Sequence, residues 1–359
     1  MDKTISNSLG LQEEIFGLIG RRPTRLETIA PGLGHRHFFR AHFDDGQLPQ
    51  SLIARVDPPE SRRDLAAKEP ALEPIRAFLE EAGLPVPRSY AHQQNMQLLE
   101  DLGDTSLETL ARQRGSAQCA DLYSRACALV PRLQKLKAPA RGHIEAFDRQ
   151  WGPELVASKA QKWLEWSFPL LHGRPASVAE KEALTQAFDY VARVALGAPR
   201  RLAHRDFKAA NLHLRPGTKE PEWVMIDLQG AFLAPPEYDL VCLLRDAHVN
   251  LPEEQVQSHL REIRLQLPDR PTEDVFMRRF DLITLTRVSK DLSHYLHAAT
   301  HRADRRYLPH VPQALRNLKA AALRLAPSDS ALAPLLETIQ ALPANLDIPH
   351  SKGGLSCEP

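Results

Sequence analysis

The chain has 359 residues, 43% of them hydrophobic, and this length favours two lobes because single hydrophobic cores stop growing at roughly 250–300 residues. Its 46 Lys and Arg residues are balanced by 45 Asp and Glu residues, so no single-signed field directs it to nucleic acid or to an anionic membrane. We therefore expect a small-molecule partner, with no nucleic acid and no membrane.

The cysteines and the amino terminus predict a cytoplasmic protein. The four cysteines form no CxxC pair and are too few for a disulfide framework in a chain this long: Cys119, Cys127, Cys242 and Cys357. The first residues show no basic start followed by an apolar stretch, and no run approaches the roughly 18 apolar residues of a membrane helix. We expect a reducing, cytoplasmic environment.

The hydrophobic pattern predicts a sheet-rich first part and a helical second part. An amphipathic helix is expected over residues 1–20, and a second over residues 69–82. Strands are expected at residues 25–30, 37–43, 51–56, 89–92 and 96–100, the first three antiparallel and joined by turn sequences. Beyond Asp104 the pattern is helical, with breaks near residues 137–142 and 172–177.

The segment from His204 to Asn211 (HRDFKAAN) carries the clearest chemistry, and it is followed by the apolar run WVMI and Asp227. Phosphoryl transfer needs an anion near the acceptor hydroxyl and oxygen ligands that hold magnesium against the ATP phosphates. Asp206 fits the first role, and Asn211 and Asp227 fit the second from opposite sides of a hairpin. Taken one by one, the three residues also have purely structural explanations: Asp206 could cap a helix, Asn211 could close a turn and Asp227 could end a strand. Together they predict a catalytic centre in which the three side chains converge.

H-x-D-x-x-x-x-N followed by I-D resembles the signature of the aminoglycoside phosphotransferase and choline kinase superfamily, relatives of protein kinases. The resemblance implies an α+β, two-lobed, protein-kinase-like fold and an enzyme that uses ATP and Mg²⁺. The smaller lobe, with an antiparallel sheet, would bind nucleotide with residues 1–100. The larger, mostly helical lobe would carry catalysis and acceptor binding in residues 101–350, and a disordered tail is expected over residues 351–359.

Several residues of the first lobe are expected to bind the nucleotide. Gly32 and Gly34 would let backbone N–H groups approach a triphosphate, although a glycine pair between strands also suits an ordinary hairpin. Arg55 stands where the superfamily usually has a phosphate-binding lysine; it keeps the charge but not the geometry. Its glutamate partner would be Glu69 or Glu73. The segment from residue 98 to 103, with Glu100 and Leu102, resembles the hinge whose main chain binds adenine.

Further motifs narrow the choice of acceptor molecule. LLEDLGD, HRDFxxxNL, IDLQGA, YDLVCLLRD and a late stretch containing Arg287 are similar to bacterial N-acetylmuramate/N-acetylglucosamine anomeric kinases. The resemblance implies transfer to the anomeric hydroxyl of an amino sugar in cell-wall recycling, with Asp239 bracing the catalytic loop through backbone hydrogen bonds. Lys208, Ala209, Ala210 and Gly230 depart from the usual residues near the acceptor.

Two alternatives stay open at this point. One is an aminoglycoside or choline-like alcohol as acceptor, which would require an acidic pocket for a cation. The other is a nucleotide-binding regulatory protein of weak catalytic power, which the arginine at position 55 suggests. A protein acceptor is disfavoured, because the segment from residue 234 follows Asp227 too closely for a long activation segment.

Overall fold

The computed structural model describes residues 3–30, 36–57, 70–93, 95–218, 221–325 and 330–343. The chain divides into two compact units. Unit 1 contains Met1–Ser106 and Asn211–Gly230, and unit 2 contains Leu107–Ala210 and Ala231–Pro359. The expected lobe boundary at residue 100 stays a prediction, and the expected tail at residues 351–359 lies outside the described residues.

Unit 1 is built on a five-stranded antiparallel sheet in the order β1-β2-β3-β5-β4. Alternating, β-branched and aromatic residues form its strands, as expected from the sequence: β1 (Arg25–Ile29), β2 (His37–His42), β3 (Ser51–Val56), β4 (Ser89–His92) and β5 (Met96–Glu100). The register places Arg55 of β3 between Phe38 of β2 and Gln97 of β5. The predicted antiparallel pairing of the first three strands is confirmed.

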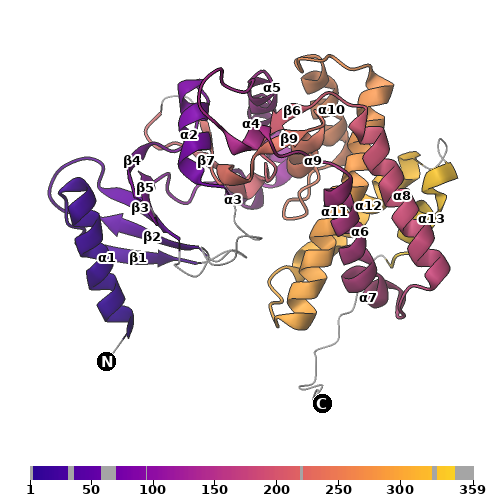
Figure 1. The fold of residues 1–359 in the computed structure, drawn as a ribbon, viewed down its shortest axis with the longest axis horizontal. Coiled ribbons are helices and arrows are strands. Elements are labelled where there is room, and N and C mark those ends of the chain that lie inside the picture. The colour runs from indigo at the N-terminus through magenta and orange to yellow at the C-terminus, as the bar shows by residue number, and fades with distance from the viewer. Residues whose placement is uncertain are drawn as a thin grey trace, which may run out of the picture. The chain divides into compact units, whose positions relative to one another are not determined.

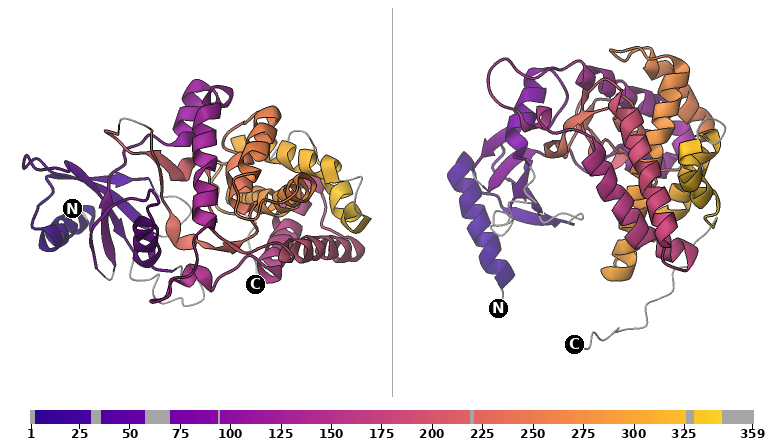
Figure 2. Two further views of the ribbon diagram at one scale, coloured as in Figure 1. Left: turned by 90° about the horizontal axis from the view of Figure 1, so that it is seen from above. Right: turned by 45° about the vertical axis from the view of Figure 1, so that its right-hand side comes forward.

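Helix α1 (Lys3–Ile19) covers one face of this sheet (Figures 1 and 2). Ile15 is fully buried, and Leu11 lies beside it in a cluster with side chains of β2, β3 and β5. Leu52 and Leu98 are the central sheet residues of that cluster. The helix therefore contributes the apolar layer that a single sheet needs on one face in order to be stable.

Unit 1 also contains helix α2 and a second hairpin. Helix α2 (Leu72–Glu81) begins two residues after Pro70, later than the expected start at residue 69, which lies outside the described residues. The hairpin pairs β7 (Leu212–Leu214) with β8 (Trp223–Met225), and the short turn η7 (Leu228–Gly230) after it packs on α2. Leu214 N–H donates to the Thr105 carbonyl oxygen at 2.9 Å, which ties the hairpin to the segment after β5.

Unit 2 is mostly helical, as predicted. Its longer helices are α3 (Leu107–Arg114), α4 (Ala120–Cys127), α5 (Leu129–Gln134), α6 (Pro153–Lys162), α7 (Phe168–His172), α8 (Val178–Leu196), α9 (Tyr238–Leu244), α10 (Glu253–Arg264), α11 (Glu273–His301), α12 (Val311–Leu325) and α13 (Ala333–Gln340). A two-stranded ladder pairs β6 (Arg201–Ala203) with β9 (Phe232–Ala234). The expected breaks near residues 137–142 and 172–177 are confirmed as bends and irregular segments between helices.

Helix boundaries in unit 2 follow local sequence signals. Ser177 starts α8 with a capping box, in which its hydroxyl and the Glu180 carboxylate satisfy each other's backbone N–H groups. Pro153 occupies the first turn of α6, where its missing N–H costs nothing. Between α6 and α7 the chain widens into one π-helical turn, Trp163–Ser167, a feature found often at functional sites.

Helix α11 is the central element of unit 2 (Figures 1 and 2). It packs against α12 along much of its length and also contacts α6, α8, α9 and the π turn. Because α11 has neighbours on several sides, most residues in its middle are buried, and the buried residues are not limited to one face of the helix. None of the helices that the structure describes is long and apolar enough to cross a membrane.

The α1–sheet contact can be tested by truncation. Ile15→Ala should lower the free energy of unfolding by about 2–5 kcal/mol, because it removes a fully buried side chain and leaves a cavity. Phe16 on the same helix is 43% exposed, so Phe16→Ala is the matched control and should cost much less. Urea unfolding followed by circular dichroism measures both; equal losses would contradict the packing described for α1.

Candidate active site

The loop predicted to be catalytic starts directly after β6 in unit 2 and is held by a buried carboxylate. Asp239, at the start of α9 and 2% exposed, accepts the His204 N–H at 2.7 Å and the Arg205 N–H at 3.0 Å. Arg205 has φ of 80°, a conformation that residues other than glycine rarely adopt. The two hydrogen bonds hold this strained backbone, and they are the backbone hydrogen bonds expected of Asp239.

A second buried acid holds the other end of the loop. Asp246 accepts the Ala209 N–H at 3.2 Å and pairs with the His248 ring at 2.8 Å. Its side chain therefore fixes the residues that follow Asp206. Sequence reasoning assigned Asp246 no role, although the spacing from Asp239 to Asp246 places both on one short helix and its end.

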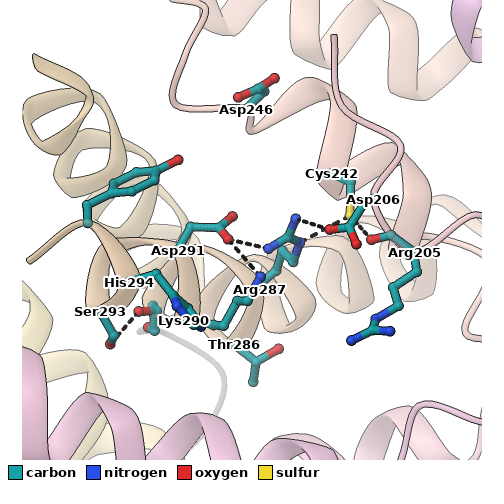
Figure 3. A network of polar contacts seen from close by, with 12 residues as sticks. Arg205, Asp206, Cys242, Asp246, Thr286, Arg287, Lys290, Asp291, Ser293 and His294 are labelled. Atoms are coloured by element: carbon teal, nitrogen blue, oxygen red, sulfur yellow. Dashed lines mark hydrogen bonds and ion pairs between the residues drawn. The ribbon is translucent and has the colours of Figure 1, made fainter. Parts of the chain in front are cut away.

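The Asp206 side chain is one-third exposed, and an arginine from helix α11 holds it (Figure 3). Arg287 donates from Nη2 to Asp206 Oδ1 at 3.1 Å. The same guanidinium pairs through Nη1 with Asp291 and donates through Nε to Cys242 Sγ at 3.2 Å. Cys242 in turn donates to the Arg205 carbonyl oxygen at 3.2 Å. One buried arginine thus connects the candidate base, the loop and α11.

The charges around Asp206 keep it ionised. Burial by itself raises its pKa, but nearby cations outweigh that effect and hold the pKa well below the ordinary range of an aspartate: Arg287, Lys290, Arg205 and Lys208. At neutral pH the group is therefore a carboxylate in a fixed orientation. It is suited to accept a hydrogen bond from an acceptor hydroxyl.

Arg287 is a residue whose role the sequence reasoning missed. It appeared only as part of a stretch of family resemblance, although it is 5% exposed and pairs with a residue 81 positions earlier. A signal was present in the helix: Arg287 and Asp291 are four residues apart, and such pairs lie on one helix face. The partner in the catalytic loop, by contrast, follows only from the tertiary fold.

Asn211 and Asp227 lie at the same end of the β7–β8 hairpin in unit 1. The ladder pairs Leu212 with Met225, and Ile226 N–H donates to the Asn211 carbonyl oxygen at 3.0 Å. Asp227 is exposed, has φ of 66° and accepts from the Gln229 side-chain amide at 2.5 Å. The structure thus brings two of the three predicted residues to one hairpin end. Their convergence with Asp206 stays a prediction.

The oxygen atoms at this hairpin end fit a magnesium ion. Mg²⁺ prefers oxygen ligands and is usually bound by one or two carboxylates together with substrate phosphates. The exposed Asp227 carboxylate and the Asn211 amide supply such donors. No group of three or more His, Cys, Asp or Glu side chains suited to a metal occurs within the described residues.

The predicted phosphate-binding residues of unit 1 are only partly described. Gly32, Gly34 and Glu69 lie outside the described residues. Arg55 is 7% exposed on β3, and its Nη2 lies 3.1 Å from Asp57 Oδ1. Glu73 on α2 pairs with Arg76 at 2.8 Å and accepts from Gln97, the residue opposite Arg55 in the sheet. The choice between Glu69 and Glu73 as the partner of Arg55 stays open.

The predicted hinge, residues 98–103, begins in β5 and continues past the end of the β3–β5 ladder. The last pair is Leu52 with Glu100, so the main chain at Leu102 has left the ladder. The Glu100 carboxylate pairs with Arg215 at 3.1 Å, which makes its side chain a link between β5 and the end of β7. Leu102 borders an open hollow of about 490 Å³, lined also by Asp101, Gly103, Leu214 and Pro216.

Comparison with protein families identifies the class of protein. Residues 25–275 match the model of the Phosphotransferase enzyme family, and the chain belongs to that family. It is similar to two curated proteins named N-acetylmuramate/N-acetylglucosamine kinase. The one from Neisseria meningitidis serogroup B is 27% identical over 85% of this chain and 87% of its own length. The one from Pseudomonas aeruginosa is 28% identical over 89% of each chain.

Solved structures show the same fold. A choline kinase from Streptococcus pneumoniae matches with a TM-score of 0.58 and 14% identity, over 89% of this chain and 99% of its own. The aminoglycoside phosphotransferase APH(2'')-Ib, solved with ADP, matches with a TM-score of 0.56 and 15% identity, over 89% and 97%. The predicted α+β, kinase-like fold and the predicted enzyme class, a small-molecule phosphotransferase, are confirmed.

Asp239→Asn tests the bracing of the catalytic loop. An amide has one acceptor oxygen where the carboxylate has two, so one of the two backbone N–H groups loses its partner at a cost of about 1–3 kcal/mol. We expect a lower melting temperature together with a lower kcat. Glu254→Gln, an exposed change on α10, is the control and should alter neither value. Unchanged kcat in Asp239→Asn would contradict the bracing role.

Lys159→Met tests a buried cation beneath α9. Lys159 is 4% exposed, its Nζ has no hydrogen-bond partner among the described residues, and it lies 5.5 Å from the Tyr238 ring centroid. Burial, followed by the charges of Arg287 and Lys290, lowers its pKa to about 7. Between pH 7 and the ordinary lysine pKa of about 10.4, the unfolded chain binds a proton that the folded chain lacks, so stability rises with pH.

The substitution should remove that contribution. Between pH 7 and pH 9, we expect the melting temperature to rise more in the unmodified protein than in Lys159→Met. Differential scanning calorimetry measures both. Parallel pH profiles for the two proteins would show that Lys159 is protonated in the folded state.

Proposed function

We propose that this phosphotransferase transfers the γ-phosphoryl group of ATP to the anomeric hydroxyl of an amino sugar of the N-acetylmuramate/N-acetylglucosamine type. The observation that supports it most strongly is the fixed, ionised Asp206, held by Arg287 on a loop that Asp239 braces. The names of the two curated relatives support the choice of sugar.

Asp206 is proposed to orient the acceptor hydroxyl and to take its proton. Because neighbouring cations lower its pKa, Asp206 is a weak base, and its main contribution is to align the hydroxyl. Weak basicity suits this reaction, since the transition state of phosphoryl transfer is loose and the nucleophile needs little prior deprotonation. Arg287 keeps the carboxylate in one orientation through the reaction.

The nucleotide side of the reaction is assigned to unit 1 and the hairpin. Asn211 and Asp227 would hold Mg²⁺, which when bound neutralises charge on the ATP phosphates. Gly32, Gly34 and Arg55 are proposed to contact the phosphates, and the main chain at Glu100 and Leu102 to contact adenine. Nucleotides bound to solved relatives of the same fold, such as AMP and ADP, support ATP as the donor.

The charges near Asp206 argue against a cationic acceptor. An aminoglycoside or a choline-like alcohol needs uncompensated acidic groups around the reacting hydroxyl. Asp206 and Asp291 are instead already paired with Arg287, and Lys290 adds a further cation beside Asp291. A neutral or anionic sugar is the better electrostatic match. The alternative of a catalytically weak nucleotide-binding protein depends on the arginine at position 55 and on the open choice of its glutamate partner.

Asp206→Asn tests the proposed base directly. We expect ADP formation with N-acetylglucosamine or N-acetylmuramate to fall about 10²–10⁴-fold, because the amide can neither align the hydroxyl as the carboxylate does nor take its proton. ATP binding measured by isothermal titration calorimetry should change little. Asp274→Asn, an exposed change on α11, is the control. Retained turnover in Asp206→Asn would refute the role.

The acceptor is tested by an ADP-release screen with the unmodified protein. N-acetylmuramate, N-acetylglucosamine, other hexoses, an aminoglycoside and choline should be compared, and the product of the best acceptor identified by phosphorus NMR. A sugar 1-phosphate is the expected product. Preference for the aminoglycoside or choline would overturn the proposed acceptor, and ATP binding without any turnover would favour the regulatory alternative.

A further inference from the structure

Lys162, the last residue of α6, is a half-buried cation without an acidic partner among the described residues. Its Nζ lies 3.4 Å from His294 Nε2 and 5.5 Å from the centroid of the Trp166 ring. Both neighbours come from the elements that pack against each other here, α11 and the π turn after α6. The aromatic ring attracts the ammonium group but does not neutralise it.

The charges that surround Lys162 are positive. Burial lowers the pKa of Lys162, and the charges of Lys290 and Arg205 lower it further. Lys290 lies 3.3 Å from Asp291, but that carboxylate also pairs with Arg287, so it is shared by two cations. Partly buried like charges destabilise a fold unless an anion compensates them. The arrangement therefore leaves positive charge for a ligand to balance.

His294 adds a neutral polar group to this cluster. A lysine ammonium can only donate, so His294 Nε2 must accept from Lys162 and the ring must be uncharged. Burial, together with Lys290 and Lys162, lowers the pKa of His294 to about 4, in agreement with that state. Trp166 packs edge-on against the ring. We call Lys162, Lys290, Arg205 and His294 the cationic cluster.

The cationic cluster lies beside the group proposed to bind the acceptor hydroxyl. Lys290 and His294 follow Arg287 by three and seven residues, so they share one face of α11. Figure 3 shows Lys290 and His294 on the helix that carries Arg287, near the carboxylate of Asp291, with Asp206 on the other side of Arg287. The side chain of Arg205 extends from the catalytic loop beside Asp206. An acceptor whose hydroxyl contacts Asp206 would place its substituents close to these cations.

We propose that Lys162 and Lys290 bind a carboxylate on the acceptor, so that the protein prefers an amino-sugar acid to a neutral amino sugar. N-acetylmuramate carries a lactyl carboxylate that N-acetylglucosamine lacks, and the two sugars are otherwise alike at the reacting carbon. This inference rests on the proposed function. A lysine ammonium is a compact point charge on a flexible stem, which suits it to bind a carboxylate. The neutral His294 leaves the charge of the two lysines uncompensated.

The test compares the two sugars in Lys162→Met. The kcat/KM for N-acetylmuramate should fall about 10–100-fold, the effect of losing a hydrogen bond to a charged group, and mainly through KM. The kcat/KM for N-acetylglucosamine should stay within about threefold. Lys162→Arg should keep most of the preference because it keeps the charge. Lys181→Met, an exposed change on α8, is the matched control.

A binding readout separates recognition from folding. Without ligand, Lys162→Met should melt at the same temperature as the unmodified protein or higher, since the change removes an uncompensated charge. N-acetylmuramate should raise the melting temperature of the unmodified protein but not that of the variant. Equal losses with both sugars, or an unchanged preference, would overturn the inference. Turnover of neither sugar by the unmodified protein would instead refute the proposed function.

Discussion

One buried carboxylate fixes the backbone on which the candidate chemistry depends. Asp239 accepts two successive N–H groups, and Arg205 would otherwise not hold a positive φ. Burial raises the pKa of Asp239 to about 6, while the hydrogen bonds from the loop favour the charged form. The fold thus maintains a costly ionised group, because no neutral side chain accepts both N–H groups equally well.

The charged residues around Asp206 form two groups: Arg287 with the two carboxylates that it pairs with, and further cations beyond them. Arg287 neutralises Asp206 and Asp291, and the surplus cations lie beyond this pair on α11 and α6. The Arg287 pairing is proposed to set the geometry of the reacting hydroxyl. The surplus cations are proposed to recognise the charge on the rest of the acceptor. Rate and recognition are therefore assigned to different side chains: Arg287 on α11 for the first, and Lys290 on α11 with Lys162 on α6 for the second.

Local patterns in the sequence were enough to predict the sheet strands, the helical second part and the HRDFKAAN motif. Each of these depends on residues close together in the chain, such as the alternation in β3 or the apolar run before Asp227. Arg287 and Lys162 could not be assigned in this way, because their partners lie 81 and 132 residues away. A charged residue in a helix is usually solvated, and only tertiary packing shows that Arg287 is buried and Lys162 half-buried in unit 2.

Because α11 is one continuous helix, the position of Asp206 and the positions of the cations on this helix are coupled. Its residues 287, 290 and 294 rise in fixed steps of about 1.5 Å per residue, and α12 packs along the same helix. Any shift of α11 along its axis would displace the anchor of Asp206 and two members of the cationic cluster, Lys290 and His294, by the same amount. A lineage that changes its acceptor is therefore restricted to exchanging individual side chains on this helix, since sliding the helix would misalign the carboxylate proposed to contact the acceptor hydroxyl.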